Sequence, residues 1–245
     1  MKKRYLWLLI LALVAADCGL AAAAAKTARQ VATGTGKITK PVVTGVDAAS
    51  LTAQAATAAF LDRSQAAQRT DQIVLVRGHQ LSLWNRQAGK WTEQLSAYAG
   101  YGYKGYNAAK REGDGTTPVG SYPLLYAFGK ENPGALLPYR QITANSWFSS
   151  ALGDGTYNTW VERSRRVVGE HLADYAATQY YYAIMIGYNV NPVVENRGSA
   201  IFLHCKGDSW DTAGCVSVAR RVMRTLMVSV QPGAWIIIAP GEGGK

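Results

Sequence analysis

Short apolar segments rich in β-branched residues recur between residues 71 and 239, and they restrict the possible folds more than any other feature of the chain. Runs of this length, bounded by glycine and polar residues, are typical of β-strands. Residues 47–69 differ, because alanine, glutamine and leucine at helical spacing predict a helix with Asp47 as a candidate N-cap. Residues 211–227 predict a turn followed by a helix. The sequence therefore predicts a mainly β domain with one or two helices packed on it. The predicted strands are 73–76, 80–84, a short one that begins at Trp91, 181–188, 199–204 and 235–239.

The N-terminal segment has the three parts of an export signal. Residues 2–4 are basic, residues 5–16 are almost wholly apolar, and residues 21–25 are small and suit a cleavage site. A bilayer span needs about 20 apolar residues, so this run is too short for a membrane anchor. The sequence predicts a signal peptide over residues 1–25. Cys18 leaves a lipid anchor as the alternative, although Asp17 before it fits a lipid-attachment motif poorly.

The rest of the chain is interpreted as a spacer followed by one long domain. Residues 26–70 combine an Ala/Thr-rich linker with the predicted helix, residues 71–240 form the domain, and residues 241–245 form a tail. A hydrophobic share of 48% excludes a wholly disordered chain. The formal net charge of +10 favours anionic partners, and export excludes nucleic acid from them. The remaining anionic partners are lipid and an acidic wall polymer.

A histidine and a cysteine near the C-terminus form the candidate reactive centre. A predicted strand ends at His204, and Gly214-Cys215 stands where we expect the second helix to begin. A helix N-terminus and a nearby imidazole both lower a thiol pKa and so favour the nucleophilic thiolate. The backbone N–H groups at such a turn suit an oxyanion hole. The alternatives are a buried structural Cys215 and a core His204. No metal-ligand spacing is present, so we expect no metal.

Three ordered motifs resemble the L,D-transpeptidase catalytic domain, also called YkuD-like. They are His204 followed by the run 212–216 (Thr-Ala-Gly-Cys-Val), the upstream run 117–120 (Thr-Pro-Val-Gly), and the strand 198–204 that leads to the histidine. The resemblance covers roughly residues 71–239. This chain departs from the common pattern at Ala213, where the family usually has histidine, and at Ser217, where arginine or asparagine is frequent. The spacer between the histidine and the cysteine is also shorter than usual.

The resemblance implies a fold and a reaction. The fold would be a YkuD-like β-sandwich with mixed sheets and a helix after the catalytic cysteine. Cys215 would attack the diaminopimelate carbonyl of a peptidoglycan tetrapeptide stem, release D-alanine, and form a 3→3 cross-link with a second stem. His204 would act as the base, with a backbone carbonyl at Cys205 orienting its ring. The N–H groups of Ala213, Gly214 and Cys215 would hold the oxyanion. No cofactor is implied, and the location would be the periplasm or cell envelope.

Further candidates and competing functions remain open from the sequence. Arg111 is a candidate for a stem carboxylate and His171 for the cleft, each with a plain surface role as the alternative. Thr212 is a candidate for substrate contact. Cys205 follows His204 on the predicted strand, so its side chain should face the opposite way. Cys205 and Cys215 either stay free or pair in a disulfide that would silence the nucleophile. If water accepts the acyl group, the protein is an L,D-carboxypeptidase or an amidase. A non-catalytic wall-binding module is the third possibility. Contact with a membrane is expected only through the uncleaved signal peptide or a lipid anchor.

Overall fold

The computed structural model describes residues 48–241. The predicted signal peptide, the linker up to residue 47 and the tail from residue 242 lie outside the described residues, so these boundaries remain predictions. Within residues 48–241, no helix is both long enough and apolar enough to cross a membrane.

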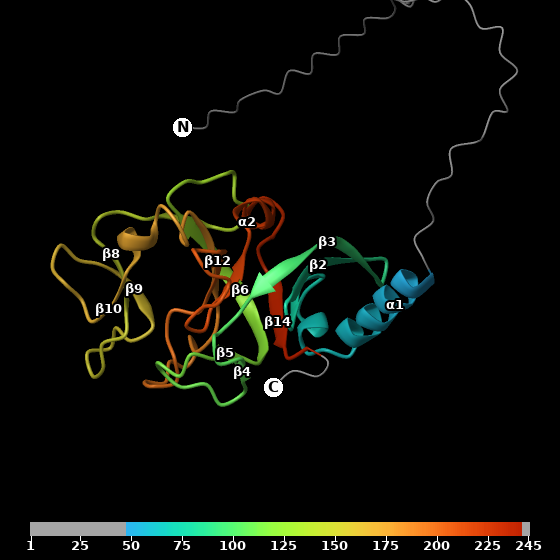
Figure 1. Ribbon diagram of the computed structural model, residues 1–245, viewed down its shortest axis with the longest axis horizontal. Coiled ribbons are helices and arrows are strands. Elements are labelled where there is room, and N and C mark those ends of the chain that lie inside the picture. Colours follow the sequence, from blue (N-terminus) through green and yellow to red (C-terminus); the bar gives the residue numbers. More distant parts are fainter. Residues whose placement is uncertain (1–47, 242–245) are drawn as a thin grey trace, which may run out of the picture. The chain divides into compact units, whose positions relative to one another are not determined.

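A nine-stranded sheet forms the centre of this part of the chain (Figure 1). A further pairing between β11 and β6 closes eight of the strands into a ring. The pairs β1–β14, β12–β13 and β6–β7 are parallel and the other pairs are antiparallel, so the predicted mainly β fold with mixed sheets is confirmed. In order, the strands are β11 (Tyr182–Ile186), β12 (Phe202–Cys205), β13 (Val216–Val218), β3 (Lys90–Gly100), β2 (Gln80–Gln87), β1 (Gln72–Arg77), β14 (Trp235–Ala239), β6 (Gly120–Gly129) and β7 (Tyr139–Gln141).

Alternation along these strands divides their side chains between the inside and the outside of the ring. Successive residues of a strand point to opposite faces. The main core therefore takes every second residue, for example Leu203 and Cys205 from β12, while Phe202 belongs to a second apolar cluster outside the ring. This alternation also turns His204 away from the core that buries Cys205. The predicted opposite orientation of these two neighbours is confirmed.

Two helices cover apolar residues of the sheet. The helix α1 (Ala48–Asp62) and the short 3₁₀ helix η1 (Ala66–Gln68) pack Leu61, Ala66 and Ala67 against the outward residues of β1 and β14, in the region predicted to be helical. The second helix, α2 (Arg220–Met227), buries four side chains in the main core: Val222, Met223, Leu226 and Met227.

The predicted start of the second helix is wrong. Cys215 precedes the strand β13, and α2 begins only at Arg220. Residues 216–218 pair with β12 on one side and with β3 on the other, and these tertiary hydrogen bonds override the local helical preference. Cys215 therefore does not lie at a helix N-terminus.

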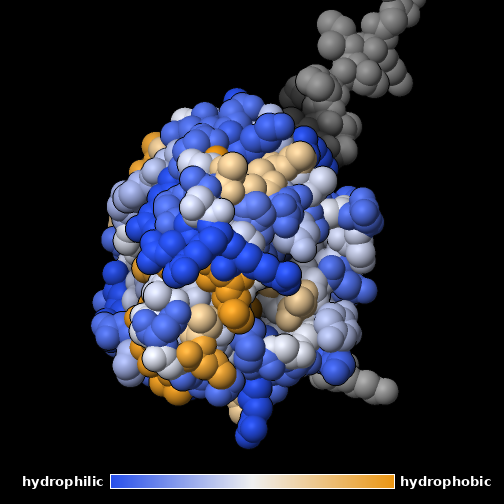
Figure 2. Space-filling view, turned by 90° about the vertical axis from the view of Figure 1, so that its left-hand side faces the viewer, coloured by the Kyte–Doolittle hydropathy of each residue, from blue (hydrophilic) through white to orange (hydrophobic). Residues whose placement is uncertain are grey.

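Two smaller sheets lie beside the ring. The first has β8 (Ser146–Ser149) between β9 (Thr159–Glu162) and β10 (Gly169–His171), followed by the 3₁₀ helix η2 (Leu172–Tyr175). Figure 2 shows this side of the molecule, which is mostly hydrophilic with apolar side chains gathered in small groups. In the second small sheet, β4 (Tyr106–Asn107) pairs in parallel with β5 (Thr117–Pro118), which contains the Thr-Pro part of the upstream motif.

One buried hydrogen bond ties α1 to the sheet and gives a stability prediction. The indole Nε1 of buried Trp91 donates to Asp62 Oδ1 at 2.8 Å. An Asp62→Ala substitution leaves this indole without its acceptor, and we expect a loss of about 1–2 kcal/mol in the free energy of unfolding. Urea titration followed by tryptophan fluorescence measures it. Asp71→Ala, which removes an exposed partner of Arg86, is the control and should cost less.

Candidate active site

His204 and Cys215 lie on neighbouring segments and line the same pocket. The strand β12 holds His204, and β13 begins immediately after Cys215; the two strands pair in parallel with Leu203 opposite Val216. Both side chains border a pocket of about 630 Å³. Parallel pairing thus brings together a histidine and a cysteine that stand in separate segments of the sequence.

The Cys215 thiol is buried and un-ionised. Its Sγ donates to Ala200 O at 3.2 Å and accepts from the Phe202 N–H at 3.3 Å. The pKa of Cys215 is raised to about 12, mainly by burial of the thiol and secondly by the charge of Glu170. We expected a lowered pKa from a helix N-terminus. That expectation was wrong, because a strand follows Cys215 and the surroundings of the thiol are apolar.

The His204 imidazole is buried, neutral and fixed in orientation. Its Nδ1 lies 2.7 Å from Cys205 O, and because a carbonyl only accepts, Nδ1 carries the proton and Nε2 keeps a lone pair. Burial lowers the pKa of His204 to about 4. Tyr180 packs against the ring edge-to-face at 5.5 Å. Among the described residues, no hydrogen bond joins His204 to Cys215, because the imidazole contacts Cys205 O while the thiol contacts Ala200 O and the Phe202 N–H.

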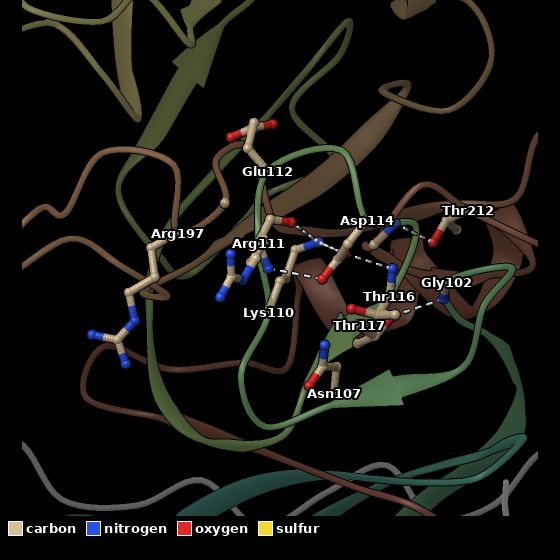
Figure 3. A network of polar contacts seen from close by, with 12 residues as sticks. Gly102, Asn107, Lys110, Arg111, Glu112, Asp114, Thr116, Thr117, Arg197 and Thr212 are labelled. Atoms are coloured by element: carbon tan, nitrogen blue, oxygen red, sulfur yellow. Dashed lines mark hydrogen bonds and ion pairs between the residues drawn. The ribbon is translucent and has the colours of Figure 1, made fainter.

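Hydrogen bonds hold the turn before Cys215. Thr212 Oγ1 accepts from the Gly214 N–H at 3.1 Å and donates to Cys215 O at 2.7 Å. Thr117 of the upstream Thr-Pro motif accepts from the Gly102 N–H, as Figure 3 shows, and also donates to Cys215 O. Gly214 has φ of +152°, a conformation that residues with a Cβ rarely adopt. The upstream motif therefore supports the cysteine turn directly.

Lys110 enters the pocket, whereas its neighbour Arg111 does not line it. The Lys110 Nζ forms an ion pair with Asp114 Oδ1 at 2.8 Å, and Asp114 also accepts from the N–H groups of Arg111 and Thr116 (Figure 3). Partial burial opposes ionisation of Asp114, but these hydrogen bonds hold its pKa well below the usual range. Sequence alone does not favour Lys110 over Arg111, because the two cations are adjacent in the same polar run.

Glu170 is a second pocket residue that the sequence did not single out. Tyr180, whose ring packs on His204, donates its hydroxyl to Glu170 Oε1 at 2.6 Å. Burial raises the pKa of Glu170, although the hydrogen bond from Tyr180 opposes the shift. A glutamate in the middle of a three-residue strand has no sequence pattern that marks it as part of a site. Only the pairing of β10 with β8 brings it to the pocket.

The family of the chain follows from a sequence comparison. The sequence model of the YkuD family, described as the L,D-transpeptidase catalytic domain, matches residues 71–238. The chain belongs to this family. The resemblance inferred from the three motifs is thereby confirmed, and residues 71–238 form an L,D-transpeptidase-type catalytic domain. No curated protein matches the chain.

Several solved structures resemble this YkuD domain at low sequence identity. Pgp2 from Campylobacter jejuni, described as a helical cell shape determining protein, is 16% identical with a TM-score of 0.40, over 69% of this chain and 48% of its own. Bd1075 from Bdellovibrio bacteriovorus is 18% identical with a TM-score of 0.39, over 71% and 50%. L,D-transpeptidase 1 from Mycobacterium tuberculosis is 12% identical with a TM-score of 0.35, over 69% and 61%. The chain thus spans about half the length of Pgp2 and Bd1075.

The YkuD domain brings together only part of the predicted site. Cys215, His204 and residues 212–214 share one pocket. His171 is not among the pocket residues, because its ring stacks on Trp147 and its two nitrogens contact Asp174 and Ala144 O. The expectation that it lines the cleft is therefore wrong. Cys205 and Cys215 are free thiols in separate apolar clusters, so the alternative of a disulfide is not realised here.

The charge of Glu170 gives a prediction for thiol reactivity. Because this charge, after burial, raises the pKa of Cys215, a Glu170→Gln substitution should lower that pKa while keeping an oxygen for Tyr180. We expect alkylation of Cys215 by iodoacetamide at pH 8 to become about 3- to 10-fold faster. Mass spectrometry of the alkylated peptide measures the rate. Glu93→Gln, an exposed change on β3, is the control. An unchanged or slower rate in Glu170→Gln would contradict the assignment.

Proposed function

We propose that this protein is an exported cysteine acyltransferase that acts on peptidoglycan tetrapeptide stems and forms 3→3 cross-links. The observation that carries the proposal is the shared pocket of the Cys215 thiol and the oriented His204 imidazole. Family membership supports the reaction class. The predicted signal peptide and the net charge of +10 suit a wall polymer that bears carboxylates.

Acylation begins with neutral groups. A thiol with a pKa of about 12 cannot transfer its proton fully to an imidazole with a pKa of about 4 before the attack. His204 Nε2 therefore takes the proton as the Cys215 Sγ bonds to the diaminopimelate carbonyl carbon. The C–N bond then breaks, and His204 returns the proton to the amine of the departing D-alanine. The carbonyl carbon remains on Cys215 as a thioester.

A second stem completes the transfer. Its amine attacks the thioester, His204 accepts one amine proton, and the proton returns to Cys215 as the C–S bond breaks. Backbone N–H groups of residues 213–215 would hold the oxyanion in both steps. At rest the Gly214 N–H donates to Thr212 Oγ1, so it would have to leave this acceptor to contribute.

Mass spectrometry of muropeptides tests the proposal. The purified chain without residues 1–25 is incubated under reducing conditions with disaccharide-tetrapeptide, beside a Cys215→Ala control. We expect a cross-linked dimer and free D-alanine only in the sample that keeps Cys215. Release of tripeptide alone would show that water is the acceptor and that the protein is a carboxypeptidase. Unchanged substrate in both samples would contradict the proposal.

A further inference from the structure

Lys110 is a buried cation in the pocket. Only 3% of its side chain is exposed, and of all the described residues that line the pocket it is the one lysine or arginine. A methyl group on Gly214 would lie 3.0 Å from its Nζ, so the absence of a side chain at Gly214 lets the ammonium approach the turn that carries Cys215. Burial of an ammonium group is costly unless partners compensate it, so this placement requires an explanation.

The hydrogen bonds of Lys110 hold the ammonium group in place and leave one of its N–H donors without an acceptor in the part of the chain that the structure describes. Asp114 Oδ1 accepts one N–H at 2.8 Å, and Arg111 O accepts a second at 3.5 Å. An ammonium group has three N–H donors. In residues 48–241 no third acceptor contacts Nζ, which leaves one donor for a ligand. Asp114 shares its own charge with the N–H groups of Arg111 and Thr116, so it does not saturate Lys110.

We propose that Lys110 binds the terminal carboxylate of the donor peptide, one residue beyond the carbonyl that Cys215 attacks. This subsite rests on the proposed function and adds the requirement that the donor ends in a free carboxylate. The geometry agrees, because Lys110 Nζ approaches Gly214, the residue immediately before Cys215, inside the pocket that both residues line. In the donor peptide, the terminal carboxylate likewise belongs to the residue next to the attacked carbonyl.

The other charged groups of the pocket reinforce this placement. The remaining charged residues that line it are all acids, namely Glu112, Glu170, Asp208 and Asp211. These acidic side chains repel a carboxylate, so the terminal carboxylate of the donor peptide is favoured next to Lys110. A hydrogen bond between a buried ammonium and a carboxylate is among the stronger polar contacts in proteins, and it fixes the peptide end as well as attracting it.

A binding experiment on the inactive protein tests the subsite without turnover. The Cys215→Ala chain is titrated by calorimetry with the stem tetrapeptide ending in D-alanine and with the same peptide ending in D-alaninamide. We expect the carboxylate form to bind about 10- to 100-fold more tightly. Adding Lys110→Met should abolish this preference. Adding Lys130→Met, which removes an exposed cation outside the pocket, should leave it intact. The comparison of acid with amide needs no change at Lys110, so it remains informative if Lys110→Met fails to fold.

Each outcome has a defined meaning. Equal binding of acid and amide would overturn the subsite while leaving the proposed function standing. A preference that persists in Lys110→Met, or that is lost only in Arg111→Met, would overturn it as well. If neither peptide binds to the Cys215→Ala chain, the proposed function itself fails and the subsite fails with it.

Discussion

A His204→Gln substitution should lower the rate of D-alanine release about 100- to 10,000-fold, which is the usual contribution of a positioned general base. The reason is the state of the thiol. With its pKa raised to about 12 by burial, only a minute fraction of Cys215 is ionised at neutral pH, so attack depends on a base that takes the proton. Glutamine is close in size and keeps a polar group beside Cys205 O, but it cannot accept this proton.

The pH dependence separates loss of the base from loss of structure. With His204 present, we expect a rate nearly independent of pH from about 5 to 9 that falls toward pH 4, because the pKa of His204 is about 4 and its protonated form cannot act as a base. In His204→Gln the residual rate should rise about tenfold per pH unit between pH 7 and 10, since it follows the thiolate fraction. A flat profile in the variant would contradict the role of His204 as the base.

Gly100→Ala should destabilise the fold by about 3 kcal/mol or more, the magnitude of severe overpacking. A Cβ at this last residue of β3 would lie 1.9 Å from Trp210 O and 2.5 Å from Ser217 Oγ. The Ser217 hydroxyl donates to that same carbonyl at 2.6 Å, so the methyl group would enter an existing hydrogen bond. The segment next to Trp210 lines the pocket, and its displacement should also reduce activity.

Gly207→Ala is the matched control for this prediction. The three atoms nearest to its Cβ all belong to the side chain of Gln179, which can move away. We therefore expect a much smaller loss of stability, below about 1 kcal/mol. Thermal unfolding followed by circular dichroism compares the two variants. Equal melting temperatures for Gly100→Ala and Gly207→Ala would contradict the predicted clash.

Sequence patterns predicted those parts of the fold that depend on neighbours along the chain. Alternation along 199–204 placed His204 and Cys205 on opposite faces, as β12 shows. The helical spacing at 47–69 corresponds to α1 and η1. The helix expected at Cys215 failed because Val216–Val218 pair with strands that are distant in sequence. Long-range hydrogen bonds of this kind leave no local pattern.

By itself, the sequence determined the family, the mainly β class and the choice of His204 and Cys215 as the candidate reactive pair. Motifs and periodicity are properties of the chain, so they need no tertiary structure. Only the tertiary structure decided that Lys110 rather than Arg111 enters the pocket, that Glu170 borders it and that His171 turns to Trp147. It also reversed the expected shift in the pKa of Cys215. The physical reason is that burial and charge act through space, so the state of a group depends on residues from many segments at once.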